Sequence, residues 1–375
     1  MKHRTVIRSA RWAVATLGIG VLVAGLGATP AAAIPAQPPP ANAIVPNGAL
    51  PKGFTSWSDV GHVQESLDRA AGRISVAAHR GDSGFAGIRV AVEQRTLQVY
   101  WKGQAPASIT RLVNTLRRDV SISVLPARYS EKELLGEMNR IVMQFRGSIS
   151  TVAPNVDGSG LTVGVAARTT ALAPRVVSAV PVTKVLSAAH CANLGDTAFD
   201  PTFETIGTVT ERDAGHDVLL IDGSAAGFVF NNVIGSPSTE FTNRVIGALG
   251  NFVGDFVCTS GAPSGTQCNI KVVAVNQTIT LRGLGTAVTG MVEAEQQNHT
   301  NAAGNGDSGG TVEQVASDNT LVFAKGTFTA FDDINAPTPC TGNILDTPTR
   351  SCSWRVWYED VLTGMGSFGA SIVTG

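Results

Sequence analysis

The sequence predicts an all-β C-terminal domain that follows a small α/β domain. The chain has 375 residues, enough for two domains that each bury a core. Its 41 glycines, 18 prolines and 6% aromatic residues are typical of short strands joined by many turns. Residues 1–190 carry 21 basic and 10 acidic side chains, whereas residues 191–375 carry 7 and 19, so the two halves differ in charge. Only 15% of the residues are charged, which excludes a generally disordered chain.

The first segment of the chain has the pattern of a secretory signal peptide. Four basic residues precede an apolar run from Trp12 to Ala28, and small-residue sites end at Ala33 and Ala43. A transmembrane anchor is the alternative, but the run is a little short for a bilayer span of roughly 20 residues. Four prolines between residues 35 and 40 then prevent a helix from continuing. We therefore assign residues 1–33 to the signal peptide, with residue 43 as a later end, and expect a secreted, extracellular product without membrane contact.

Residues 44–168 are predicted to form the small α/β domain. Alternating apolar residues indicate a hairpin of two strands, 87–92 and 97–101, and apolar residues from Ile109 to Leu116 recur at helical spacing. A strand over 120–125 follows. Ser130 and Glu133 have the spacing of a capping box, in which each side chain binds the other residue's free amide, and an apolar helical face begins behind them. A turn at residues 157–160 leads into one more strand, 161–166.

One motif in this domain, His79-Arg80-Gly81-Asp82-Ser83-Gly84, contains a histidine and a serine. Only three residues separate His79 from Ser83. A serine nucleophile needs a base within hydrogen-bond reach and a third group that orients that base. Close neighbours in a loop rarely hold this geometry, so we interpret the motif as a polar turn before the next strand.

All five cysteines lie in the acidic half of the chain. The sequential pairings are Cys258–Cys268 and Cys340–Cys352, which leaves Cys191 as the odd thiol. Disulfides persist outside the cytoplasm, and loops this short typically gain about 3 kcal/mol from a crosslink. Other pairings remain open, because sequence alone does not determine connectivity.

Three segments of the acidic half bring together the residue types of nucleophilic catalysis, in the chain order His, Asp, Ser. An apolar strand ends at His190, Asp217 begins a strand, and Ser308 lies in the glycine-rich loop 304–310. A serine hydroxyl is a poor nucleophile until an imidazole takes its proton, and a buried carboxylate fixes the tautomer of that imidazole. The glycines let backbone N–H groups close around an oxyanion. Taken singly, His190 could be a partly buried core histidine, and Asp217 could simply begin a strand.

These segments resemble the three signatures of chymotrypsin-like serine proteases. The spacing of 27 residues from His190 to Asp217, and of 91 from there to Ser308, is similar to that of the bacterial streptogrisin and alpha-lytic protease group. Residues 257–268 resemble the disulfide-closed hairpin of this group. The resemblance covers residues 180–360. It implies two antiparallel β-barrels in residues 169–375, with the site in the cleft between them.

The resemblance also implies a role for each residue. His190 is the expected general base, Asp217 its orienting partner and Ser308 the nucleophile, while the amides of Gly306 and Ser308 are expected to form the oxyanion hole. The expected substrate pocket contains Ala302, Thr329 and Phe331. A neutral Ala302 argues against cleavage after Lys or Arg, and Phe331 narrows the pocket unless it belongs to an ordinary apolar strand. Residues 44–168 are similar to a pro-region that assists folding and inhibits the protease until it is cleaved.

The chain departs from the family pattern ahead of the catalytic histidine. Only residues 167–189 stand between the predicted pro-region and His190, and no cysteine precedes Cys191. We therefore expect a first barrel that lacks one or two opening strands, unless residues 149–168 supply a strand. A missing strand exposes a sheet edge and loosens the support of His190. This departure is the basis of an alternative function, a catalytically impaired protease-like binding protein.

The expected partners are a protein or peptide substrate and the chain's own pro-region, in an otherwise monomeric protein. No cofactor is expected, and the scattered histidines lack the spacing of metal ligands. The basic half has no reader motif for nucleic acid. Without the four basic residues of the signal peptide, the basic half has a net charge of +7 and the catalytic half −12. We expect these charges to attract, so that association of the two parts weakens as salt rises.

Overall fold

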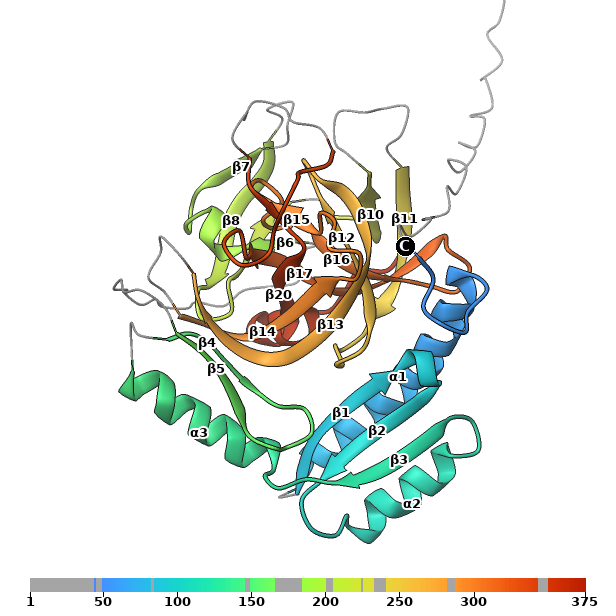
Figure 1. The fold of residues 1–375 in the computed structure, drawn as a ribbon. Coiled ribbons are helices and arrows are strands. Elements are labelled where there is room, and N and C mark those ends of the chain that lie inside the picture. The colour runs from blue at the N-terminus through green and yellow to red at the C-terminus, as the bar shows by residue number, and fades with distance from the viewer. Residues whose placement is uncertain are drawn as a thin grey trace, which may run out of the picture. The chain divides into compact units, whose positions relative to one another are not determined.

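The structure is a computed structural model that describes residues 44, 49–81, 84–145, 149–165, 184–199, 205–223, 225–232, 241–281, 287–342 and 350–375 (Figure 1). The predicted signal peptide lies outside the described residues. Within the described ranges, none of the helices has the length and apolar character needed to cross a membrane. We refer to residues 49–165 as the N-terminal module and to residues 184–375 as the C-terminal domain.

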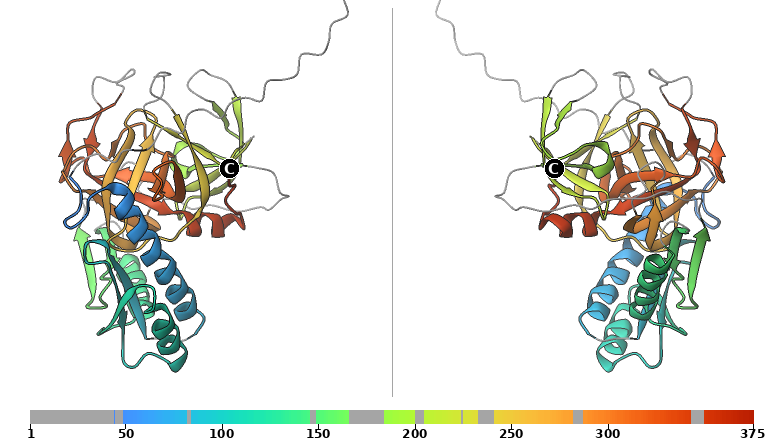
Figure 2. Two further views of the ribbon diagram at one scale, coloured as in Figure 1. Left: turned by 90° about the vertical axis from the view of Figure 1, so that its right-hand side faces the viewer. Right: turned by 90° about the vertical axis from the view of Figure 1, so that its left-hand side faces the viewer.

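The N-terminal module contains a three-stranded sheet in the order β1-β2-β3, with β1 antiparallel and β3 parallel to β2. Helices α1 and α2 lie side by side on one face of this sheet (Figure 2). The predicted order of strand, strand, helix, strand and helix is confirmed. Its elements are α1 (Trp57–His79), β1 (Phe85–Ala91), η1 (Val92–Gln94), β2 (Thr96–Trp101), α2 (Ala107–Leu116), β3 (Ser121–Pro126) and α3 (Glu131–Gln144).

Helix α1 is the longest helix in the described part of the chain, and it was not predicted from the sequence. The Ser56 side chain accepts a hydrogen bond from the Asp59 amide at 3.1 Å and so caps the helix N-terminus. Leu67, Ala71 and Ile74 recur at helical spacing and are almost fully buried against the sheet. This face supplies much of the core of the module.

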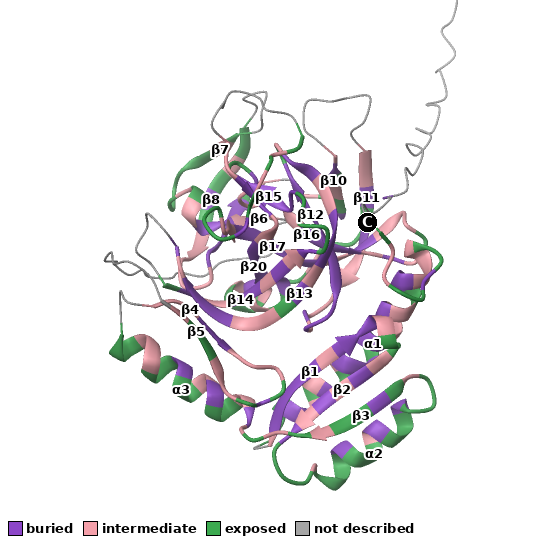
Figure 3. Ribbon diagram, in the orientation of Figure 1, coloured by how far each residue is buried: buried purple, intermediate pink, exposed green. Residues whose placement is uncertain are grey.

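The capping box at the start of α3 is confirmed. The Glu133 amide donates to Ser130 Oγ at 3.3 Å, and the Ser130 amide donates to Glu133 Oε2 at 2.9 Å. The apolar face of α3 is narrow, and Leu134 and Met138 are its buried residues. Residues on the outward faces of α2 and α3 are exposed, whereas buried residues line the inner strands and α1 (Figure 3).

Residues 149–165 form a hairpin of β4 (Ile149–Pro154) and β5 (Leu161–Val165). The predicted turn and following strand are therefore present. However, β4 pairs with the C-terminal end of β13 (Gly265–Thr280), where Val152 lies opposite Thr278. The alternative that this segment supplies a strand to the first barrel is therefore wrong for residues 149–165, because the hairpin completes its hydrogen bonds on the second barrel instead.

Six strands of the C-terminal domain close into an antiparallel barrel. Each pairs with two others in the cyclic order β12-β13-β14-β20-β17-β16 and back to β12. The core inside this ring is apolar and includes Ile270, Ala294, Phe328 and Val356. The ring strands are β12 (Phe256–Gly261), β13 (Gly265–Thr280), β14 (Ala287–Gln296), β16 (Thr311–Val315), β17 (Leu321–Phe331) and β20 (Arg355–Asp360), and β11 (Phe241–Ala248) with β10 (Phe228–Asn231) continues from β17.

A second sheet of the C-terminal domain has four antiparallel strands in the order β6-β9-β8-β7. They are β6 (Lys184–Ala188), β7 (Thr197–Phe199), β8 (Thr205–Asp213) and β9 (Val218–Asp222). In the described ranges β6 and β7 are its outer strands. The predicted shortage of opening strands concerns residues 167–183, which the structure does not describe. The C-terminal domain is all-β as predicted, apart from the short helix α4 (Val361–Phe368).

Both predicted disulfides are confirmed. Cys258–Cys268 links β12 to β13, and Cys340–Cys352 closes the loop that leads to β19 (Cys352–Ser353). Strand β19 pairs with both β15 (Ala303–Gly304) and β18 (Pro337–Thr338). Cys191 is free and exposed, as the odd count requires.

Candidate active site

The pairing of β6 with β9 brings His190 and Asp217 together. Ala188 lies opposite Val218, so the residues that follow β6 and precede β9 meet at one end of the sheet. His190 Nδ1 lies 2.8 Å from Asp217 Oδ2, and the His190 amide donates to Asp217 Oδ1 at 2.8 Å. Asp217 has a φ of 56° and a side chain that is 3% exposed. The carboxylate therefore fixes the Nδ1–H tautomer and leaves Nε2 as the acceptor.

The environment of His190 favours the imidazolium. Burial by itself lowers the pKa of His190, but hydrogen bonds with Asp217 and Cys191, together with the negative charge of Asp217, outweigh it and raise the pKa to about 10. The ring is 22% exposed, so one edge remains accessible. His190 can take a proton from a hydroxyl only in its neutral form, and the same surroundings then stabilise the cation that results.

The loop that carries Ser308 packs against the end of β6. A Cβ atom on Gly309 would lie 2.2 Å from Ser187 Oγ, so only glycine permits this approach, and its φ of 82° has the same requirement. Cys191 Sγ lies 3.9 Å from the Ser308 carbonyl oxygen. Ser308 is thus a neighbour of the His190 segment. Among the described residues, however, the Ser308 hydroxyl makes no hydrogen bond with His190. In enzymes without substrate, the distance between nucleophile and base is often too long for this bond and shortens when substrate binds.

Backbone amides in this loop alternate between bonded and free. Asp307, Gly309 and Gly310 donate to carbonyl groups at 2.9–3.2 Å, whereas Gly306 and Ser308 donate to no described residue. Gly306 has a φ of 88°, in the left-handed region that favours glycine. Two free N–H groups beside one hydroxyl are the donors that an oxyanion requires.

Asp307 holds the loop from beneath. Its carboxylate is buried and accepts hydrogen bonds from the Ser264 amide at 2.9 Å, the Ser264 hydroxyl at 2.6 Å and the Gly304 amide at 2.7 Å. Arg350 Nη2 donates to Asp307 Oδ2 at 2.6 Å, and both side chains are at most 3% exposed. The residue beside the candidate nucleophile is therefore fixed by a buried ion pair.

Arg350 belongs to no sequence motif and was not predicted as a site residue. Its Nε donates to the Asn305 carbonyl at 2.8 Å and its Nη1 to the Thr341 carbonyl at 3.2 Å. It stands two residues before Cys352, so the Cys340–Cys352 disulfide restrains the segment that carries it. Proximity to a disulfide was the one available signal in the sequence, and it does not identify a partner.

The three expected pocket residues lie in or against the closed barrel. Ala302 has no exposed surface, and its carbonyl accepts a hydrogen bond from Thr259 Oγ1 at 2.6 Å. Thr329 is buried on β17, and Phe331 is half-buried against the barrel core. Their role in substrate binding stays a prediction.

Two other histidines use ring nitrogens for contacts with neighbouring groups. His79 ends α1, where its ring nitrogens contact Glu131 Oε2 at 2.7 Å and the Ser75 carbonyl at 2.8 Å, while Ser83 lies outside the described residues. His216 uses Nδ1 for Asp213. Within the described ranges, no three metal-binding side chains gather into a group that could hold an ion.

Two solved structures are similar to part of the chain. One is a glutamic-acid-specific serine protease, with 18% identity, a TM-score of 0.38, and coverage of 60% of this chain and 98% of that chain. The other is a Nocardiopsis protease, with 18% identity, a TM-score of 0.37, and coverage of 61% and 99%. No protein-family model and no curated protein matches the chain. The geometry of the chain's own site is therefore the basis for its function.

Proposed function

We propose that the chain is a secreted serine endopeptidase, made as an inactive precursor. Residues 1–33 serve as the signal peptide, residues 44–168 as the inhibitory pro-region and residues 169–375 as the protease domain. The observation that carries this proposal is the His190–Asp217 pair, in which a buried carboxylate contacts both the ring and the amide of the histidine at 2.8 Å. A buried carboxylate that orients the imidazole in this way is what a serine nucleophile requires of its base.

In the proposed reaction Ser308 Oγ attacks the scissile carbonyl of a peptide while His190 Nε2 removes its proton. The carbonyl oxygen becomes an oxyanion, which the free amides of Gly306 and Ser308 stabilise. His190 then gives the proton to the leaving amine, and the acyl-enzyme forms. Water attacks the acyl-enzyme with His190 as the base again, which releases the acid and restores Ser308.

A second candidate is a catalytically impaired protease-like binding protein. One observation favours it: among the described residues, the Ser308 hydroxyl and His190 share no hydrogen bond. Such a protein binds peptide without hydrolysing it.

A fluorophosphonate probe distinguishes the two candidates, because it reacts only with an activated serine. We expect labelling of the processed wild-type protein at Ser308 and none in Ser308→Ala. Ser371→Ala is the control, since Ser371 is an exposed serine of the same domain, and it should retain full labelling. A folded wild-type protein that is not labelled would rule out the endopeptidase.

The labelling rate should depend on pH in a definite direction. Only neutral His190 accepts a proton, and its pKa is raised to about 10, so the rate should rise with pH through the alkaline range. Cys191→Ser removes one of the interactions that raise this pKa, so the rising limb should move to lower pH. A rate that falls with rising pH would contradict His190 as the base.

A further inference from the structure

A buried cluster of three charged groups spans the boundary between the N-terminal module and the closed barrel. Lys325 on β17 has no exposed surface, and its Nζ lies 2.8 Å from Asp255 Oδ2 and 2.9 Å from the Gly250 carbonyl oxygen. Asp68 on α1 is the third member, with its Oδ2 at 3.7 Å from Nζ and a side chain that is 1% exposed. The module therefore inserts a carboxyl group into a site that already contains a cation and an anion.

The charges in this cluster do not balance. Lys325 and Asp255 neutralise each other within the barrel, so an ionised Asp68 adds one uncompensated negative charge in a buried site. Both oxygens of Asp68 lack a hydrogen-bond donor among the described residues, and so does Asp255 Oδ1. A buried carboxylate without donors is strongly unfavourable. A proton on Asp68 removes the surplus charge and supplies a donor.

The groups that face this cluster from other elements do not supply the missing cation. Gln314 on β16 is uncharged and buried, and beyond Lys325 stand Asp360 and Tyr358 at the end of β20. On α1 itself, Arg69 is exposed and pairs with Glu65. Burial and the charge of Asp255 raise the pKa of Asp68 well above its usual range, against the opposing effect of Lys325.

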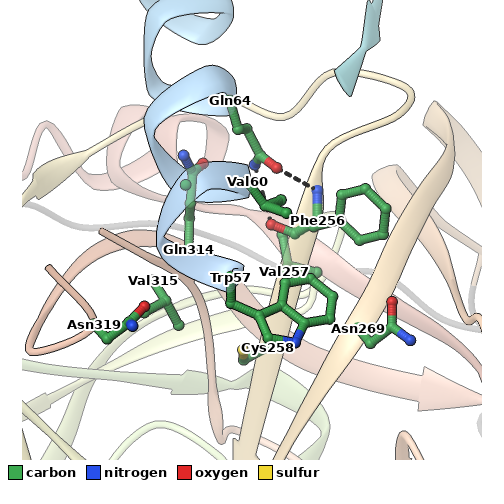
Figure 4. Close-up of a pocket in the computed structure, with 11 residues that line it drawn as sticks. Trp57, Val60, Gln64, Phe256, Val257, Cys258, Asn269, Gln314, Val315 and Asn319 are labelled. Carbon is green, nitrogen blue, oxygen red and sulfur yellow. Dashed lines mark hydrogen bonds between the residues drawn. The ribbon is translucent and has the colours of Figure 1, made fainter. Parts of the chain in front are cut away.

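The contact next to Asp68 on the same helix is uncharged. The side-chain amide of Gln64, one turn before Asp68, pairs with the backbone of Phe256: it accepts from the amide at 2.8 Å and donates to the carbonyl at 3.0 Å (Figure 4). Trp57 packs edge-on against the Phe256 ring, with 5.9 Å between centroids. Two other carboxylates of the module face the barrel with a partner, Glu93 with Lys271 and Glu65 with the Ser317 amide. Asp68 differs from them because it is fully buried and neither of its oxygens has a donor among the described residues.

We propose that attachment of the N-terminal module to the barrel is coupled to protonation of Asp68, so that the module is held at low pH and released as pH rises. Its biological consequence, activation after a cut between module and protease domain, rests on the proposed function. The coupling itself does not. In the attached state Asp68 keeps its proton over a range in which the free module, whose carboxyl has a usual pKa of about 3.9, has lost it. Attachment is therefore strongest below about pH 4 and weakens as pH rises towards the pKa of the attached state.

The test uses the full chain with Ser308→Ala, so that catalysis plays no part. An engineered protease site between residues 165 and 184 is cut after folding, and the fraction of released N-terminal fragment is measured by gel filtration from pH 4 to pH 9. In the window above about pH 4, the dissociation constant should rise by up to tenfold per pH unit.

Asp68→Asn carries the uncharged isostere and should keep the fragment attached throughout, with a nearly flat pH curve. Asp59→Asn makes the same change at another aspartate of α1, which forms an exposed ion pair with Arg95. This variant should retain the pH dependence of the parent. Equal curves for the parent and Asp68→Asn, stronger release at low pH, or an Asp68→Asn protein that does not fold would each overturn the proposal. If the coupling holds while the fluorophosphonate test fails, the proposed enzyme function is wrong and the proton-linked interface stands.

Discussion

At the scale of single residues, the Ser308 loop is positioned by Arg350 as much as by its glycines. The glycines permit the backbone conformation, but Asp307 needs a partner for its buried charge, and the Arg350 guanidinium supplies it at 2.6 Å. The same guanidinium binds carbonyl groups of Asn305 and Thr341, on either side of the site. A planar fork with five donors suits this arrangement, and a lysine ammonium does not.

Arg350→Met should therefore both destabilise the protein and reduce the reactivity of Ser308. Breaking a buried pair by removal of one partner costs about 3 kcal/mol or more, because the other charge remains buried. We expect a loss of this size in urea unfolding and slower fluorophosphonate labelling under conditions in which the protein is folded. Arg355→Met is the matched control, since Arg355 pairs with Glu293, Glu295 and Asp332 but is 28% exposed. Its cost should be about 1 kcal/mol. Normal labelling in folded Arg350→Met would show that the ion pair does not position the loop.

The candidate site could be predicted from the sequence where chemistry is written in local motifs. His190, Asp217 and Ser308 each lie in a recognisable segment, and the structure brings the first two into hydrogen-bond contact. Arg350 could not be predicted, because its partner Asp307 is 43 residues away and the contact depends on how the disulfide loop folds back. A long-range pair of this kind leaves no periodic pattern.

At the scale of secondary structure, the approach of β1 to the barrel depends on one glycine. The Val90 amide donates to the Val253 carbonyl at 2.8 Å, and Arg89 bridges to Val253 in parallel. Gly254, the next residue, has a φ of 103°, and a Cβ atom there would lie 1.9 Å from the Val90 carbonyl oxygen. The chain can pass at this distance only without a side chain.

Gly254→Ala should weaken attachment of the module by more than the cost of placing an alanine in a left-handed backbone conformation. Left-handed backbone costs a non-glycine residue about 1–2 kcal/mol, and the contact with Val90 adds a clash. Gly53→Ala is the control, because Gly53 also has a positive φ, 88°, but no atom within 4 Å of the added methyl group. We expect a clearly larger drop in the urea midpoint, and more fragment released from the cut chain, for Gly254→Ala. Equal effects of the two substitutions would mean that the close approach is unimportant.

Elements with a clear local pattern could be predicted, and those defined by distant partners could not. Alternation identified β1 and β2, and the capping box identified the start of α3. The β4–β5 hairpin was also visible, but its partner β13 was not, because strand alternation does not specify which edge a strand joins. Helix α1 was missed although Ser56 and Asp59 provide a capping signal and apolar residues recur behind them.

At the scale of the whole molecule, the charges at the module–barrel boundary are opposite in sign to those of the two halves. The module comes from the basic half, yet its member of the Glu93–Lys271 ion pair across the boundary is the acidic one. The basic partner, Lys271, comes from the acidic half. At the contact, the basic half therefore contributes an acidic side chain and the acidic half a basic one. The attraction between these two side chains does not depend on the net charge of either half. The net charges act at longer range, through the surfaces outside the contact.

Salt should therefore weaken attachment through the long-range attraction and leave the contact pairs little affected. Between about 0.05 and 0.5 M salt the screening length falls from about 14 to 4 Å, which removes attraction between distant surfaces but not between buried partners. For the cut chain at a pH of partial release, we expect the released fraction to rise steadily with NaCl. Lys271→Gln should raise release at every salt concentration without changing the slope, because it removes one contact pair and only one of many distant charges. A slope that disappears in Lys271→Gln would place the salt dependence in the contact itself, and the charge division between the halves would then have no part in holding the module.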